Sequence, residues 1–108
     1  LTVTGVQTCA LPILAVGTAN VLIDSWDSTI YRSAQYSISS SNAADSQFAE
    51  VRIVQNAGIA VINSGPVLNT GANTVTFYAN VTGNTVKLLA NGTVAGNQVR
   101  IKRTYFIL

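Results

Sequence analysis

Short apolar runs, separated by turns rich in Gly and Asn, follow one another along nearly the whole chain and constrain its fold more than any other feature. Val, Ile and Thr, whose branched side chains suit a pleated sheet, make up 34 of the 108 residues. No stretch sustains the 3.6-residue apolar period of a capped helix. The spacing of the turns predicts an antiparallel sandwich or barrel. These turns are Asn56-Ala57-Gly58, Asn63-Ser64-Gly65-Pro66, Asn69-Thr70-Gly71, Gly83-Asn84, Asn91-Gly92 and Gly96-Asn97.

We therefore expect an all-β antiparallel β-sandwich of about seven strands, jelly-roll or Greek-key-like, with a strand order that the sequence leaves open. The clearest alternation places Val75 and Phe77 inward and Thr76 and Tyr78 outward. The uninterrupted apolar run Ile59–Ile62 predicts a strand buried on both faces. The expected strands are residues 21–24, 30–40, 48–55, 59–62, 67–68, 74–81, 85–90 and 98–107.

The start of the chain has a different character. Residues 3–13, VTGVQTCALPI, resemble the in-frame translation of a short sequencing adapter, as found on gene fragments from environmental (metagenomic) DNA. An N-terminal strand and a signal peptide are the competing interpretations, but no Lys or Arg precedes the apolar run, as a signal peptide requires. We therefore divide the chain into a non-native segment, residues 1–13, and a single sandwich domain, residues 14–108, which we expect to be a fragment of a longer protein.

Composition excludes several classes of function. The chain has no His and one Cys, so Ser-His-Asp and Cys-His sites and an internal disulfide framework are impossible. Six basic residues are too few for a nucleic-acid surface, and the longest apolar run is too short to span a membrane. A carboxylate pair could come only from Asp24, Asp27, Asp45 and Glu50, and none of these lies in a recognisable motif. We expect no enzyme activity, no cofactor and no metal.

The segment Asp24-Ser25-Trp26-Asp27-Ser28 holds two of the four acids and the single Trp. Its oxygen ligands suit Ca²⁺, but the spacing lacks a dense calcium-loop pattern and a closing Glu. A turn that ends a strand, with Trp26 closing the core, is the favoured interpretation. We expect Arg32 to pair with Asp24 or Asp27 and to pin this loop structurally. Binding of an anionic ligand by Arg32 is the alternative.

Two surface features follow from the alternation. Lys87, Arg100, Lys102 and Arg103 form a basic cluster that we interpret as a solvated sheet face rather than a nucleic-acid site. Apolar residues of the opposite parity cannot all fit into the single interior of a small sandwich. Of these, Leu89, Phe106 and Ile107 are predicted to form an interaction surface, covered by another copy or by an adjacent domain.

Two segments carry a family resemblance: residues 21–26, VLIDSW, and residues 31–36, YRSAQY. They are similar to a signature of virion structural proteins of tailed phages, especially T4-like phages of marine bacteria. Glu50-Val51, then GNTVKLL at residues 83–89 and VRIKRT at 99–104, follow in the same order. The similarity covers residues 21–107, with Trp26 where Phe is usual, Gln35 where Lys is usual, and only a loose match over residues 59–73.

The resemblance implies a non-enzymatic β-sandwich module of the virion, used in tail, baseplate or fibre assembly, whose partners are other virion proteins or copies of itself. It implies no catalytic residues. The alternative is a carbohydrate-binding or adhesin-like module, although no feature of the sequence specifies a sugar ligand. Exposure of Trp26, Tyr31 or Tyr78 in one shallow groove would favour sugar binding, and burial of these rings would favour the structural role.

Overall fold

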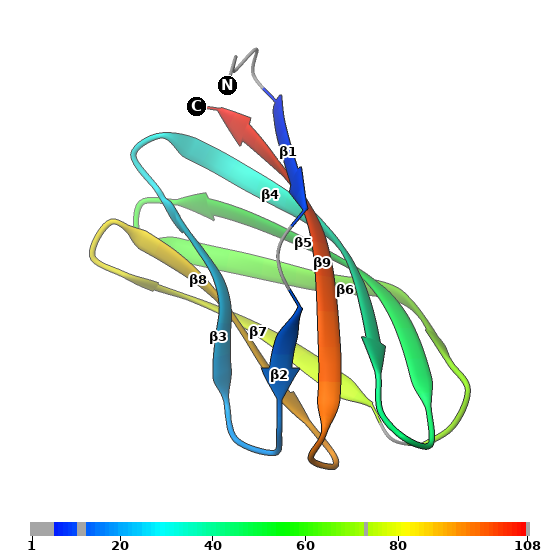
Figure 1. The fold of residues 1–108 in the computed structure, drawn as a ribbon. Helices are drawn as coiled ribbons and strands as arrows, with labels where there is room; N and C mark the ends of the chain where they lie inside the picture. The colour runs from blue at the N-terminus through cyan, green and yellow to red at the C-terminus, as the bar shows by residue number, and fades with distance from the viewer. Residues whose placement is uncertain (1–5, 11–12, 73, 108) are drawn as a thin grey trace.

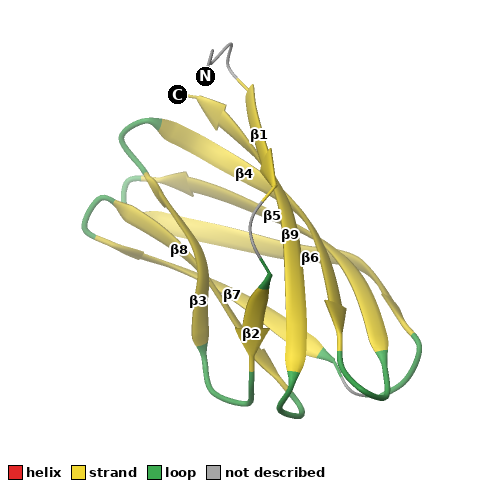
Figure 2. Cartoon of the chain, viewed as in Figure 1, coloured by secondary structure: helices red, strands yellow, loops and turns green. Residues whose placement is uncertain are grey.

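Two antiparallel β-sheets pack face to face in this computed structural model, which describes residues 6–10, 13–72 and 74–107 (Figure 1). The expected all-β sandwich is confirmed, with nine strands in the described residues instead of about seven. Figure 2 shows strands and loops only, and no helix that could cross a membrane occurs in the described ranges. The strands are β1 (Val6–Ala10), β2 (Leu14–Val16), β3 (Val21–Asp27), β4 (Tyr31–Ser41), β5 (Ser46–Asn56), β6 (Ile59–Asn69), β7 (Val75–Thr82), β8 (Thr85–Gly92) and β9 (Asn97–Ile107).

The larger sheet has six strands in the order β1-β9-β4-β5-β6, with β2 also pairing with β9. The smaller sheet has three, in the order β3-β8-β7. Strands β4, β5 and β6 follow one another as a meander, and β7 and β8 form a hairpin. The last strand, β9, returns to the larger sheet and lies between β4 and the N-terminal strands (Figure 1).

The core lies between the sheets and follows the alternation expected from the sequence. Along β4 and β5 every second residue is buried. The inward residues of β7, β8 and β9 complete the same interior, as predicted. The buried apolar residues are Val16, Ile23, Trp26, Ala34, Tyr36, Ile38, Ala49, Val51, Ile53, Val75, Phe77, Val86, Leu88, Ala90, Val99, Ile101 and Tyr105.

One strand differs from the expectation. The run Ile59–Ile62 was predicted to be buried on both faces, but it belongs to β6, the last strand of the larger sheet. Ile59 and Val61 are 68% and 61% exposed. The predicted short strand at Val67-Leu68 is the continuation of β6 after a bulge at Pro66. An apolar run indicates burial only where layers cover both faces, and no layer covers the outer face here.

Part of the adapter-like segment forms a strand. Strand β1 pairs with β9, from Val6 opposite Phe106 to Ala10 opposite Lys102. Residues 1–5 and 11–12 of the segment lie outside the described residues. Backbone pairing at a sheet margin makes few demands on sequence, so the non-native origin of residues 1–13 stays a prediction.

Deletion of residues 1–13 is expected to leave the thermal midpoint within a few degrees of the full chain, because the described core begins at Val16. Thermal unfolding followed by circular dichroism measures this. Deletion of residues 1–16 is the control, since it removes Val16 and should lower the midpoint further. A drop of more than about 10 °C on the shorter deletion would show that β1 is a stabilising strand of the domain.

Candidate interaction surface

A β-bulge in β3 turns Asp24 into the interior. Leu22 lies opposite Leu89 and Asp24 lies opposite Leu88, so Ile23 is the extra residue of the bulge. Ile23 and Asp24 are therefore both buried, although neighbours along a regular strand point to opposite faces. Trp26 is buried two residues further on, as expected, but β3 continues to Asp27 and the turn begins only there.

Asp24 is the centre of a buried polar cluster that joins the two sheets. Its Oδ2 accepts hydrogen bonds from the hydroxyls of Tyr36 (2.7 Å) and Tyr105 (2.6 Å). Its Oδ1 forms an ion pair with the Arg103 guanidinium, which also lies over the Tyr105 ring at 4.7 Å from the centroid. Asp24 belongs to the smaller sheet and its three partners belong to the larger one. We call these four residues the inter-sheet cluster.

Arg32 is not part of this cluster, so the predicted Asp24–Arg32 pair is wrong. A second bulge makes Arg32 the extra residue between Tyr31, opposite Ile107, and Ser33, opposite Phe106. The exposed Arg32 side chain donates to Asn56 Oδ1 at 3.0 Å instead. Arg103, predicted to lie on a solvated face, points inward. Counting alternate positions from Ile101 would have placed Arg103 and Tyr105 on the buried side.

The electrostatics of the cluster fit a structural role. Burial, reinforced by the Asp24 carboxylate, raises the pKa of Tyr36 and of Tyr105 well above the usual range. Both phenols therefore remain hydrogen-bond donors at neutral pH. At the strand end, the hydroxyl and backbone N–H of Thr29 lower the pKa of Asp27 by donating to its Oδ1. No group of three or more potential metal ligands occurs among the described residues.

The outward-pointing side chains of the larger sheet form a second candidate site, which we call the outer face. Strand register places Phe106, Ser33, Val54 and Val61 in one row across β9, β4, β5 and β6, a span of about 14 Å. The next row holds Thr104, Gln35, Arg52 and Asn63, and an apolar pair, Phe48 and Leu68, lies further along. A further row, which holds Lys102, Ser37 and Glu50, lies between them, so two polar rows separate the first row from Phe48 and Leu68.

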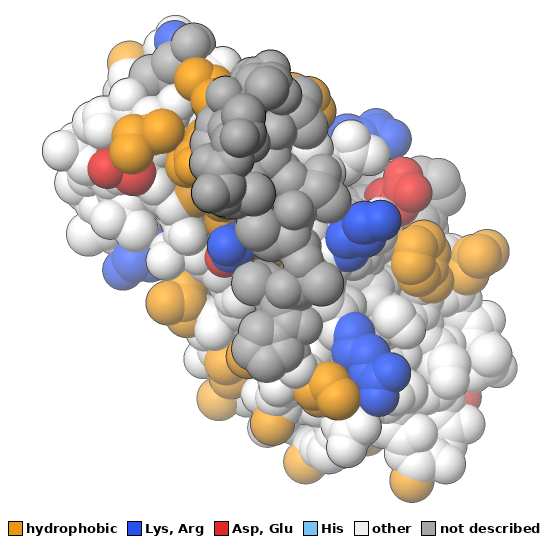
Figure 3. Space-filling view, turned by 45° about the horizontal axis from the view of Figure 1, so that its top comes forward, with side chains coloured by type: hydrophobic (Ala, Val, Ile, Leu, Met, Phe, Trp, Pro, Cys, Tyr) orange, Lys and Arg blue, Asp and Glu red, His pale blue; other side chains and the backbone are white. Residues whose placement is uncertain are grey.

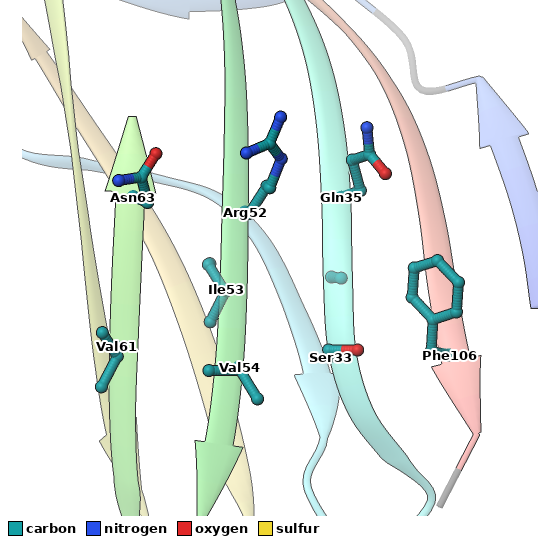
Figure 4. Close-up of a pocket in the computed structure, with 9 residues that line it drawn as sticks. Ser33, Gln35, Arg52, Ile53, Val54, Val61, Asn63 and Phe106 are labelled. Carbon is teal, nitrogen blue, oxygen red and sulfur yellow. The ribbon is translucent and has the colours of Figure 1, made fainter. Parts of the chain in front are cut away.

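The first row lines a shallow depression of about 330 Å³. Figure 4 shows Asn63, Arg52 and Gln35 side by side, with Val61, Val54, Ser33 and Phe106 in the row below them. A second depression, of about 310 Å³, lies between Phe48 and Leu68. Leu68 is 70% exposed and Phe106 37%. Large apolar side chains that recur on one sheet face in this way are typical of a contact surface.

The outer face is also basic. Among the described residues it carries Arg52, Arg100 and Lys102 against one acid, Glu50. The nearest approach of Arg52 to Glu50 is 3.9 Å between Nη2 and Oε2, and both side chains are exposed, so the pair contributes little. Figure 3 shows Lys and Arg side chains close together on one face of the molecule, with hydrophobic side chains beside them. The expected solvated positions of Arg100 and Lys102 are confirmed.

The predicted surface of Leu89, Phe106 and Ile107 is divided between different parts of the molecule. Phe106 lies on the outer face, and Ile107 follows it at the end of β9. Leu89 is half-buried on the opposite side of the sandwich, where it lies between Leu22 and Tyr78 on the smaller sheet. These residues therefore do not form one surface. Phe48, Val54 and Leu68 belong to the outer face but were not among the predicted surface residues. The outward parity of Phe48 and Val54 could have been counted from Val51 and Ile53 on the same strand, whereas Leu68 lies beyond the bulge in β6.

Comparisons with known proteins give limited matches. No family model and no curated protein sequence matches the chain. Two solved structures are similar: the tailspike protein of Acinetobacter phage vB_ApiP_P1 (17% identity, TM-score 0.49) and tailspike protein gp49 of Acinetobacter baumannii bacteriophage Fri1, a capsular polysaccharide depolymerase (14% identity, TM-score 0.48). The matches cover 100% and 97% of this chain but only 22% and 20% of the tailspike chains. The chain therefore spans about one-fifth of the length of either tailspike protein.

We predict that Asp24 is energetically coupled to Arg103 and not to Arg32. Asp24→Ala should lower the free energy of unfolding by about 3–5 kcal/mol, because it leaves Arg103 and two buried phenols without their acceptor. A double-mutant cycle of Asp24→Ala with Arg103→Ala should give a coupling of about 0.5–3 kcal/mol. The matched cycle with Arg32→Ala should be additive, and equal coupling in the two cycles would contradict this assignment. Chemical denaturation supplies all the values.

The free energy of unfolding should fall at alkaline pH because Tyr36 and Tyr105 ionise more readily in the unfolded chain than in the folded one. Their pKa values are raised in the folded state and are near 10 in the unfolded chain, so the unfolded state loses its protons first. The contribution of the two phenols to the free energy of unfolding is complete below about pH 9. Above about pH 10 the free energy of unfolding declines by about 1.4 kcal/mol per pH unit for each phenol. Denaturation at several pH values tests this. The decline should be shallower in Tyr36→Phe and Tyr105→Phe, and an unchanged slope would contradict the interpretation.

Proposed function

We propose that this chain is a non-enzymatic structural module of a phage virion, which contributes to the assembly of a tail, baseplate or fibre by packing its outer face against a neighbouring virion protein. The phage setting rests on the resemblance of residues 21–107 to virion structural proteins. The observation that carries the role is the outer face itself, where exposed Phe48, Val54, Leu68 and Phe106 are spread across the larger sheet.

The composition of the outer face supports contact with protein. The apolar row that includes Phe106 lies next to the row of Arg52, Gln35 and Asn63, so the face offers both apolar area to bury and hydrogen-bonding groups, the combination found in protein interfaces. Regular β-strands hold these side chains on a sheet that is anchored from inside by the core. A neighbour therefore meets a surface that needs little rearrangement to bind.

The positions of the acids support a non-enzymatic role. Asp24 lies inside the sandwich and accepts bonds from two phenols and a guanidinium, so it is committed to the fold. Asp27 is held by Thr29 in a turn, and Asp45 lies beside Thr70 in another loop. Glu50 stands on the outer face next to Arg52. Hydrolysis of a glycosidic bond usually needs two carboxyl groups that face the same substrate bond, and this distribution does not favour such a pair.

A carbohydrate-binding module is the second candidate, and the depression beside Phe106 is the observation that favours it. An aromatic ring next to Arg52, Gln35 and Asn63 could contact both the apolar and the hydroxyl-bearing sides of a sugar. The rings named from the sequence do not form such a groove. Trp26 is buried, Tyr31 packs on Tyr105 at 4.8 Å between centroids, and Tyr78 is exposed on the smaller sheet. We therefore prefer protein contact.

The test begins with the complete gene and its genomic neighbours, which should include tail or baseplate genes. The full-length protein is then co-expressed with those neighbours and purified. We expect it to bind one of them and expect Leu68→Lys or Val54→Lys to weaken that binding by about tenfold or more, because a charge is buried at the contact.

Leu22→Lys is the matched control. It replaces an exposed leucine on the smaller sheet, and should leave binding unchanged. Genes of metabolism around the complete gene, or equal effects of Leu22→Lys and Leu68→Lys, would contradict the proposal. Polysaccharide cleavage by the isolated chain would contradict its non-enzymatic part. Retention on immobilised oligosaccharides that is lost in Phe106→Ala would favour the second candidate.

A further inference from the structure

The two strands on one lateral side of the sandwich contain no charged residue. Residues 53–86 contain no Asp, Glu, Lys or Arg, and they include all of β6 and β7, the last strands of the two sheets on that side. Natural proteins usually protect exposed strand edges with charged side chains, often Lys, because an open edge attracts another strand. Strand β6 has no such protection over Ile59–Ser64, and its first proline is Pro66.

The free edge of β6 has a defined set of hydrogen-bonding groups. Strands β5 and β6 are joined by the two-residue turn Ala57-Gly58, in which both residues have positive φ. In such a hairpin the flanking residues, Asn56 and Ile59, exchange both backbone hydrogen bonds, and every second pair does the same. The N–H and C=O groups of Ala60, Ile62 and Ser64 therefore point away from β5. No described strand pairs with them.

The side chains at this edge are also incompletely covered. The smaller sheet has three strands against six, so it does not extend fully over β6. Ala60 and Ile62 point inward but are only half-buried, and the inward-facing Val67 is 41% exposed. On the other face, Ile59 and Val61 are largely exposed. A strand added beside β6 would cover apolar side chains on both faces.

We propose that the β6 edge pairs with the β6 edge of a second copy of this chain, antiparallel and about a twofold axis, so that the two larger sheets become one continuous sheet. A second copy fits better than an unrelated strand because this edge is its own complement: it is uncharged, and a twofold axis places equivalent donors and acceptors opposite one another.

The hydrogen-bonding pattern fixes the register. Pairs that exchange hydrogen bonds between the two copies must join residues whose backbone N–H and C=O groups point away from β5. A twofold axis at Ile62 uses all three of these residues. Ile62 then lies opposite its own equivalent, and Ala60 lies opposite Ser64 of the partner subunit. Pro66 has no N–H and is the extra residue where the β5–β6 register shifts, so the pairing ends before it.

This inference deepens the proposed function by naming a partner and a contact, but its hydrogen bonds form at the edge of the larger sheet, whereas the proposed function uses the outer face of β4, β5 and β9. The two contacts can therefore be separated by mutation. Ala60→Pro removes one outward N–H that β5 does not use, and it leaves the outer face unchanged. Val54→Lys alters the outer face on β5, which is an interior strand, and it leaves the backbone donors and acceptors of β6 unchanged.

The experiment measures sedimentation equilibrium of the chain and of both variants, together with amide hydrogen exchange by NMR at several concentrations. We expect a monomer–dimer equilibrium in the unmodified chain and in Val54→Lys, weakened by about tenfold or more in Ala60→Pro. The amides of Ala60, Ile62 and Ser64 should become protected as concentration rises. Those of Ile59, Val61 and Asn63 should be protected throughout, which also shows that the hairpin is folded.

Three results would overturn the proposal. The first is free exchange of the three outward amides at every concentration. The second is dimerisation that survives Ala60→Pro but is lost in Val54→Lys, which would assign self-contact to the outer face and leave the proposed function standing. The third is protection of these amides only in complex with another virion protein, which would identify a different chain as the occupant of the edge.

Discussion

The buried carboxylate of Asp24 is the interaction on which the arrangement of the two sheets depends. A charge inside a sandwich is costly unless it is paired and hydrogen-bonded, and Asp24 meets this condition only when Tyr36, Tyr105 and Arg103 of the opposite sheet surround it. Sliding one sheet over the other by a residue pair would leave the carboxylate without these donors. The cluster thus specifies how the sheets face one another, which apolar contacts alone would determine less sharply.

Alternation was sufficient to predict most of the fold, because a two-residue period needs only a buried and a solvated face. It failed where a bulge changed the parity. The extra residue Ile23 brings Asp24 inside, and the extra residue Arg32 directs that side chain away from the interior. A bulge adds one residue with no distinctive composition, so it cannot be recognised from the sequence. The sequence indicated that Asp24 needs a cationic partner, but the predicted partner was Arg32 and not Arg103. Arg103 lies 79 residues from Asp24 along the chain, and only the sheet order brings them together.

The candidate surfaces were less predictable for a different reason. The residues of the run Ile59–Ile62 suit a strand that is buried on both faces and also a strand with one exposed face. The position of β6 at the end of the sheet decides which of the two occurs. Likewise, Phe106 and Leu89 share the outward parity, but parity does not say which sheet a strand joins. Single-strand patterns give the direction of a side chain relative to its own sheet. Which outward side chains share a surface is a property of the topology.

The unequal width of the two sheets explains why both proposed contacts lie on the larger one. Three strands can cover only part of six, so apolar side chains at the margin of the larger sheet stay exposed among the described residues. Charge is distributed in the complementary way: Arg52, Arg100 and Lys102 lie on the outer face, whereas residues 53–86 carry none. Two copies meeting through their outer faces would bring like charges together, but copies meeting through β6 would not. The same asymmetry thus favours a different neighbour on each surface, a self-contact at the edge and a protein of complementary charge on the face.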